Sequence, residues 1–168
     1  MTTWHDVELA VPDLAQRAHG ILASTTNCVL GSLRRDGSAR LSGIDPFFIE
    51  GDLLFGSMPD ARKGRDLKRD PRMSLHSIPW ESRKVRDGRE DPGEGDAKLT
   101  GLAVVVTDPA AFAAVAAVQG GEHDASSPPD YDLFRVDVLD LVVVAVADAQ
   151  LVIDRWSLAD GRTTVHRD

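Results

Sequence analysis

Residues 30–80 read LGSLRRDGSARLSGIDPFFIEGDLLFGSMPDARKGRDLKRDPRMSLHSIPW, and this stretch carries the strongest signal for the fold. Its first half consists of short apolar segments separated by Asp36-Gly37 and by Glu50-Gly51-Asp52. These turn residues tolerate the positive φ angles that tight hairpins need. The pattern therefore predicts an antiparallel meander, with strands over 27–34, 40–49 and 53–57.

The second half of the stretch changes from a strand pattern to a helical one. Residues 60–69 are predicted to form a helix, with Asp60 as its N-cap and Asp70-Pro71 as its stop signal. The alternation over 73–78 predicts a further strand.

The flanking regions extend this mainly β pattern. An apolar face recurs at helical spacing from residue 4 to 23, although Pro12 could divide that helix into a short turn and a helix that begins at Pro12. A charged, Gly- and Pro-containing loop is expected over 81–96, and a second polar loop over 120–130. The other predicted elements are a strand over 98–107, a helix over 109–118 capped by Asp108, strands over 133–138, 142–148 and 151–156 with turns near Asp140 and Asp148, and a short strand over 162–166.

About eight strands, with two or three helices and no alternating βαβ units, favour a closed antiparallel barrel over a parallel sheet. The 168 residues suffice for a single domain. The expected fold class is therefore mainly β, a barrel with accessory helices.

The composition limits the partners and the cellular compartment that are expected for the protein. The net charge of −8 argues against nucleic acid or an anionic membrane as the main partner. No apolar run reaches the length of about 20 residues that a membrane helix needs, and the N-terminus does not resemble a secretion signal. The lone Cys28, set among apolar residues, is expected to be a buried thiol. Together these features predict a cytoplasmic protein, and the five histidines show no spacing typical of a metal site.

A basic cluster stands out from this acidic background and indicates a site for a discrete anion such as a phosphate. Arg62 and Lys63 fall in the first turn of the predicted helix, where free N–H groups favour anions, and Ser57 could add a hydroxyl. An ordinary solvated basic helix is the alternative. Arg40 and Ser42 share one face of their strand, so Arg40 either reaches an anion at the barrel mouth or faces water. The cluster comprises Arg62, Lys63, Arg65, Lys68, Arg69 and Arg72.

These features together resemble the signature half of the pyridoxamine 5'-phosphate oxidase-like family of flavin-binding split β-barrels. The shared pattern consists of the Asp-Gly hairpin, the Arg-x-Ser strand, a strand that ends before an Arg-Lys pair opening a helix, and the DPRMSL…PW segment. The likeness covers residues 26–80 and continues more loosely to LVIDRW near the C-terminus. It implies a homodimer in which each flavin site is shared between two subunits.

The resemblance assigns roles to individual positions. It implies that Arg40, Arg62 and Lys63 hold the flavin phosphate, and that the ribityl chain and ring contact Leu41, Ser42, Gly56 and Ser57. Trp156 and Arg162 would reach the cofactor from the partner subunit. The alternative for Trp156 is an aromatic residue of the core, and the alternative for Arg162 is an ordinary surface arginine. Arg65, Lys68, Arg69 and Lys98 are basic residues available for the longer acidic tail of a deazaflavin coenzyme.

Departures from the family pattern limit the reaction. Asp45 stands where the true oxidases carry a lysine for the substrate phosphate, Ala61 replaces a serine, and Thr164 and His166 occupy the positions of a His and an Arg. The expected function is therefore hydride transfer between a bound cofactor and a small-molecule substrate, rather than pyridoxal phosphate synthesis. FMN is the expected cofactor and a deazaflavin coenzyme the alternative; no catalytic acid or base is identified. A protein that binds a flavin or a related ligand without turnover is the competing interpretation.

Overall fold

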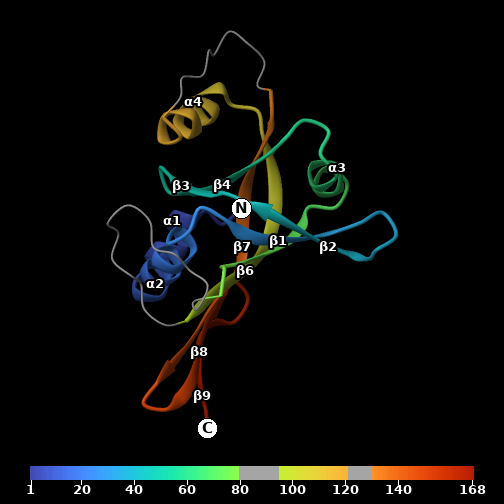
Figure 1. The fold of residues 1–168 in the computed structure, drawn as a ribbon. Coiled ribbons are helices and arrows are strands. Elements are labelled where there is room, and N and C mark those ends of the chain that lie inside the picture. Colours follow the sequence, from blue (N-terminus) through green and yellow to red (C-terminus); the bar gives the residue numbers. More distant parts are fainter. Residues whose placement is uncertain (80–94, 121–129) are drawn as a thin grey trace.

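In the computed structural model, which describes residues 1–79, 95–120 and 130–168, helices cover one twisted antiparallel sheet (Figure 1). The predicted loops over 81–96 and 120–130 lie almost entirely outside these residues. The elements are α1 (Trp4–Ala10), α2 (Pro12–Ala23), β1 (Cys28–Leu33), β2 (Ala39–Ile44), β3 (Pro46–Ile49), β4 (Asp52–Ser57), α3 (Arg62–Arg69), β5 (Arg72–His76), β6 (Asp96–Val106), α4 (Pro109–Val118), β7 (Asp132–Ala147), β8 (Gln150–Ser157) and β9 (Gly161–Arg167).

The sheet has the order β2-β1-β5-β6-β7-β4-β3, and every pairing is antiparallel. β2 also lies against β4, so the two arms of the sheet approach each other as in a split barrel. The predicted fold class is confirmed.

β7 organises the sheet because its residues Leu133–Val144 pair with β6 along the whole length of β6. Its opposite edge pairs first with β4 and then, after residue 139, with β8. The β8–β9 ribbon therefore continues away from the barrel and carries the C-terminus (Figure 1).

The turn predicted near Asp140 is wrong. β7 continues through this position with a bulge, since Asp140 pairs with Thr100 whereas Val138 pairs with Gly101. The Asp140 carboxylate accepts a hydrogen bond from Arg155 on β8. A polar residue within a paired strand was therefore mistaken for a turn residue in the sequence pattern.

Two further boundaries differ from the sequence prediction. The N-terminal region forms two helices rather than one, because Val11 leaves helical geometry and Pro12 opens α2; this is the division that Pro12 suggested. The strand predicted over 40–49 is interrupted at Asp45, after which β3 begins. The predicted helix over 109–118 is confirmed, and the Asp108 carboxylate accepts from the Ala110 N–H at 3.0 Å.

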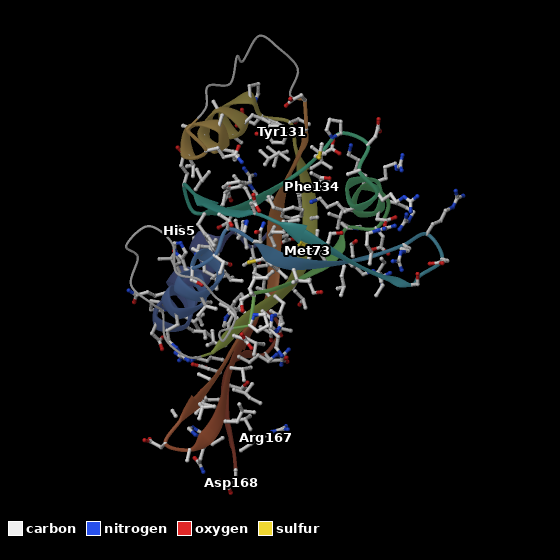
Figure 2. The ribbon with its side chains drawn as sticks, viewed as in Figure 1. His5, Met73, Tyr131, Phe134, Arg167 and Asp168 are labelled. Carbon is white, nitrogen blue, oxygen red and sulfur yellow. The ribbon has the colours of Figure 1, made fainter. Side chains whose placement is uncertain are left out.

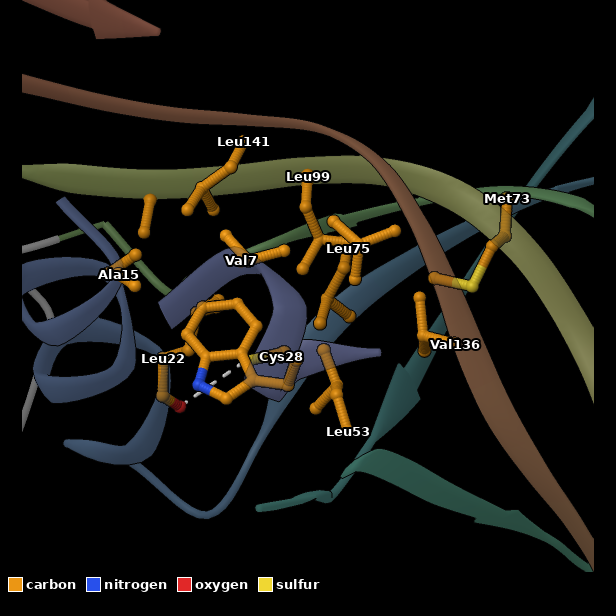
Figure 3. Close-up of a cluster of buried hydrophobic side chains, with 14 of the residues drawn as sticks. Val7, Ala15, Leu22, Cys28, Leu53, Met73, Leu75, Leu99, Val136 and Leu141 are labelled. Carbon is orange, nitrogen blue, oxygen red and sulfur yellow. Dashed lines mark hydrogen bonds between the residues drawn. The ribbon is translucent and has the colours of Figure 1, made fainter. Parts of the chain in front are cut away.

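The core lies between α1, α2 and the sheet. Trp4 packs edge-on against Phe48 with ring centroids 4.8 Å apart, and Figure 3 shows Val7 and Leu22 from the helices among strand side chains such as Leu75. A smaller cluster beneath α4 contains Phe112 and Val115. β4 faces both clusters, which explains why three consecutive residues, Leu53 to Phe55, are all buried.

Cys28 belongs to the main core, as predicted. Its Sγ donates to the carbonyl of Leu22 at 3.5 Å (Figure 3). Burial, with a smaller contribution from the negative charge of Asp45, raises the pKa of this thiol to about 12, so it stays protonated and poorly reactive at neutral pH.

Two searches of residues 1–79, 95–120 and 130–168 gave negative results. None of the helices there has the length and hydropathy of a membrane span. Nor do three or more His, Cys, Asp or Glu side chains gather there in a way that could hold a metal ion.

Candidate functional site

α3 begins just beyond the end of β4 and packs closely against it. A Cβ added to Gly64 would lie 2.9 Å from Asp132 Oδ2 and 3.0 Å from Ser57 Oγ. Glycine therefore allows the first turn of α3 to approach the strands closely, since a Cβ here would require the Asp132 and Ser57 side chains to move. Lys63, which directly precedes Gly64 in the chain, lines the same hollow as the buried Ser57.

The N-terminus of α3 has no side-chain cap, so the predicted N-cap at Asp60 is wrong. Ala61 is the N-cap, and among residues 1–79, 95–120 and 130–168 no capping side-chain hydrogen bond satisfies this helix start. Asp60 has a φ of 56°, which turns the chain before the helix starts, one residue too early for a cap. Free N–H groups at a helix start, with two cations beside them, favour an anion.

A hollow of about 650 Å³, here called the arginine hollow, opens between α3 and the β1–β2 hairpin. Figure 2 shows nitrogen-bearing side chains gathered around these two elements. It is lined by six arginines and two aspartates: Arg34, Arg35, Asp36, Arg40, Arg62, Arg65, Asp66 and Arg69.

Asp66 is the buried acidic residue of this hollow. It is 6% exposed and accepts hydrogen bonds from Arg40 Nε at 2.6 Å and from Arg69 Nη1 at 2.8 Å. Burial alone would raise the pKa of this carboxyl, but the hydrogen bonds from Arg69 and Arg40 outweigh burial and hold the pKa below its ordinary value. The hydrogen bond from Arg40 to Asp66 therefore connects β2 to α3.

A second hollow of about 270 Å³, here called the α4 hollow, lies between the ends of β2 and β4 and helix α4. Lys63 enters it, and its Nζ donates to the carbonyl of Gly43 at 2.9 Å. Burial lowers the pKa of Lys63, and the negative charge of Asp45 partly opposes that shift. The lining residues are Gly43, Ile44, Asp45, Phe47, Gly56, Ser57, Met58, Lys63, Val115, Gln119 and Tyr131.

Tyr131 closes one side of the α4 hollow, near the end of β4 (Figure 2). Its ring lies beside Gly56, where an added Cβ would be 3.6 Å from Cδ2, and it packs edge-on against Phe112. The hydroxyl is buried and has no hydrogen-bond partner within the described ranges. Burial, together with the charge of Asp130, raises the pKa of Tyr131.

Five of the ten predicted site residues line the two hollows that border α3. Arg40 and Arg62 line the arginine hollow, and Gly56, Ser57 and Lys63 line the α4 hollow. As predicted, the polar positions of β2 share a half-buried face, whereas Leu41 is 75% exposed on the opposite face and Ser42 lies on the Arg40 side.

Three predicted residues lie elsewhere within the subunit. Lys98 is exposed on β6, opposite His76 and Val142. Trp156 is 6% exposed in the main core and pairs with Arg162 across β8 and β9.

Arg162 is engaged by acids of its own subunit. Its Nε and Nη2 donate to Asp154 at 3.0 and 2.8 Å, and its Nη1 and Nη2 donate to Asp13 at 2.7 Å. Asp154 also accepts from Arg17 at 3.1 Å. Contacts of Trp156 and Arg162 with a partner's cofactor stay predictions.

Sequence reasoning missed Asp66, Arg34, Arg35 and Tyr131. Asp66 carried a weak signal, as an acidic residue within a basic helix. Arg34 and Arg35 flank the hairpin turn, and only the folded hairpin places them opposite α3. Tyr131 is distant from the signature stretch, and no local pattern marks it.

Comparison with known proteins gives the family. The model of the pyridoxamine 5'-phosphate oxidase family matches residues 14–145. A search of curated proteins gave no significant match.

Solved structures agree on the fold. A heme binding protein from Mycobacterium smegmatis superimposes with a TM-score of 0.61 at 21% identity, over 86% of this chain but only 57% of that protein. PhzG from Burkholderia lata, solved with tetrahydrophenazine-1-carboxylic acid, gives a TM-score of 0.61 at 14% identity, over 95% of this chain and 90% of PhzG. An F420 reductase gives 0.51 at 18% identity, over 73% of this chain and 94% of that protein. With its matching family model and its antiparallel split barrel, the chain belongs to the pyridoxamine 5'-phosphate oxidase-like family.

Proposed function

We propose that this protein is a cytoplasmic, homodimeric oxidoreductase that binds a flavin-type cofactor and transfers a hydride to or from a small-molecule substrate. FMN is the favoured cofactor and a deazaflavin coenzyme the alternative. The observation that carries the proposal is the uncapped start of α3, where Arg62 and Lys63 lie between two hollows.

The donor set of this region fits a cofactor phosphate. Free first-turn N–H groups, the guanidinium of Arg62, the ammonium of Lys63 and the hydroxyl of Ser57 are all hydrogen-bond donors from neighbouring positions. Arg40 adds positive charge but shares it with Asp66. These residues would hold the anionic end of the cofactor.

The α4 hollow fits the flat, largely apolar end of such a cofactor. Gly56 leaves room beside the Tyr131 ring, and Phe47 and Val115 supply apolar walls that would exclude water. A bound flavin would supply hydride chemistry, whereas the protein supplies binding, orientation and electrostatics. Asp45 places a carboxylate in this hollow, which would disfavour a phosphorylated substrate.

The dimer proposal follows from the family and bears on Trp156 and Arg162. A partner subunit would bring its β8–β9 ribbon toward the cofactor, as the resemblance implies. Lys98, exposed on β6, would contribute only to a longer acidic tail. Nucleic acid and membrane surfaces are not proposed as partners, since the net charge is −8.

Binding without turnover is the second candidate. The fold-level likeness to the heme binding protein favours this second candidate, because the name of that protein states binding and no reaction. The two candidates differ in the rate at which a substrate oxidises or reduces the bound cofactor. In an oxidoreductase this rate exceeds the rate with free cofactor, whereas in a binding protein it does not.

Absorbance titration and native mass spectrometry with FMN and with the deazaflavin coenzyme test the proposal. We expect a saturable complex with one cofactor per subunit in a dimer, and about 10-fold weaker binding in Lys63→Ala, which loses one charge-assisted hydrogen bond. Arg72→Ala is the matched control, because Arg72 is an exposed cation that pairs with Asp70 and lines neither hollow. If neither cofactor binds, the proposed function is wrong and only the family assignment stands.

A further inference from the structure

Arg162 on β9 is held by two acids of its own subunit at the base of the β8–β9 ribbon. Its Nε and Nη2 donate to the two oxygens of Asp154 at 3.0 and 2.8 Å, and its Nη1 and Nη2 donate to the two oxygens of Asp13 at 2.7 Å each. These bonds engage all three nitrogens of the guanidinium, whose N–H groups are the donors with which an arginine binds carboxylates and phosphates. A further ligand would have to compete with both carboxylates.

Asp154 on β8 is the buried centre of these contacts. Its side chain is only 4% exposed, and its oxygens also accept hydrogen bonds from Arg17 at 3.1 Å and from Thr164 at 3.2 Å. Burial alone would raise the pKa of this carboxyl, but the hydrogen bond and the positive charge of Arg162 outweigh burial and hold the pKa below its ordinary value. The carboxylate is therefore ionised at neutral pH, and losing its main cationic partner would leave a buried charge poorly compensated.

The contacts join three elements that are distant in the chain. Asp13 and Arg17 lie four residues apart on one face of α2, Asp154 belongs to β8, and Arg162 belongs to β9. The formal charges of the two carboxylates and the two guanidiniums cancel, so this group, unlike the arginine hollow, has no net attraction for an anion. It is here called the ribbon clamp and comprises Asp13, Arg17, Asp154, Arg162 and Thr164.

We infer that Arg162 fixes the β8–β9 ribbon on α2 of its own subunit and is not a ligand of a partner's cofactor. To reach a cofactor, Arg162 would have to leave both carboxylates. Trp156, its cross-strand neighbour, is 6% exposed in the main core, so the ribbon is held there on the same side. Only the exclusion of Arg162 from a cofactor site rests on the proposed function, since the ribbon clamp exists whichever ligand binds.

Hydrogen exchange by mass spectrometry over residues 161–167, together with thermal unfolding of the full chain, tests the ribbon clamp. Arg162→Ala should speed exchange of the protected β9 amides about 10-fold and lower the melting temperature by about 6 °C. Asp13→Asn leaves Arg162 in place and should speed the same exchange about threefold, because Asp13 is 61% exposed and exposed ion pairs contribute less. Arg72→Ala is the matched control, since it breaks an Arg–Asp pair at the surface, and should change neither readout. FMN should bind Arg162→Ala and Asp13→Asn with wild-type affinity.

Two outcomes overturn the inference. One is that Arg162→Ala and Asp13→Asn exchange and melt like Arg72→Ala, which would mean that the contacts do not hold the ribbon. The other is that Arg162→Ala weakens FMN binding about 10-fold whereas Asp13→Asn does not, because Arg162 would then contact the cofactor directly. Failure of the proposed function looks different: wild type would bind neither FMN nor the deazaflavin coenzyme, and exchange and melting would still decide whether the ribbon clamp exists.

Discussion

The arginine hollow and the α4 hollow both border α3, yet they present opposite chemistry to a ligand. The arginine hollow is the larger, at about 650 Å³ against 270 Å³, and carries a net charge of +4. In the α4 hollow, Lys63 is balanced by Asp45 and the walls are largely apolar. One region would select a ligand by charge and the other by shape.

Two consecutive residues connect these regions. Arg62 lines the arginine hollow and Lys63 lines the α4 hollow, because successive side chains on an α-helix point about 100° apart. The Arg-Lys pair at the start of α3 therefore lies at the junction of the two hollows. The difference between the hollows can be tested by substitutions that affect one of them or both.

The largest effect is expected from removing both cations at once. Arg62→Ala combined with Lys63→Ala should weaken cofactor binding about 100-fold, because two charge-assisted hydrogen-bond donors are lost, each worth about 1.5 kcal/mol. Fluorescence titration with FMN checks this. Unchanged affinity would place the phosphate elsewhere, and Arg72→Ala, at an exposed cation that lines neither hollow, serves as the control.

The next effect concerns the arginine hollow alone. Asp66→Ala should lower the free energy of unfolding by about 2 kcal/mol, because Arg40, whose side chain is 17% exposed, would lose its carboxylate partner. Urea unfolding at neutral pH measures it. Asp70→Ala is the control, since Asp70 pairs with Arg72 at the surface, where ion pairs contribute little; equal losses in both variants would contradict a special role for Asp66.

The same variant should alter the pH dependence of stability. The folded pKa of Asp66 lies below its ordinary value of 3.8, so its stabilising contribution is complete above that pH and is lost as the pH falls through the folded pKa. Wild type should therefore lose more stability than Asp66→Ala on acidification below about pH 4. Parallel unfolding curves across this range would show that Asp66 is not the group responsible.

A smaller effect is expected in the α4 hollow. Gly56→Val should weaken FMN binding about 10-fold, because a branched side chain would fill space beside the Tyr131 ring. Gly56→Ala is the matched control and should bind FMN nearly as well as wild type, because its Cβ would lie at an ordinary contact distance of 3.6 Å from Tyr131 Cδ2. Equal weakening in both variants would show that side-chain size beside Tyr131 is not the cause.

The smallest effect is expected from Tyr131→Phe. The Tyr131 hydroxyl is buried without a hydrogen-bond partner in the described ranges, so its removal should leave stability unchanged or raise it by up to about 1 kcal/mol. Thermal unfolding without ligand measures this. Clear destabilisation would show that the hydroxyl has a partner in solution.

Local physics made much of the fold predictable. The turns at Asp36-Gly37 and Glu50-Gly51 have positive φ at Gly37, Glu50 and Gly51, a conformation that glycine adopts without strain and that few other residues tolerate. Asp108 and Pro109 began their helix where expected because capping and proline geometry act within one turn. The predicted β8 and β9 strands were right to within one residue at each end.

By itself the sequence determined the mainly β class, the Arg-Lys start of α3 and the family resemblance, since each depends on residues close together in the chain. Only the tertiary structure decided which cations are available to a ligand. Arg40 lies 26 residues from Asp66, and Arg162 lies 149 residues from Asp13, yet each pair forms hydrogen bonds. No local pattern reports such contacts, because charge pairing between distant segments depends on which elements the sheet brings together. Of the arginines that line the arginine hollow, that arrangement leaves Arg35, Arg62 and Arg65 without a side-chain hydrogen bond or ion pair within the described residues.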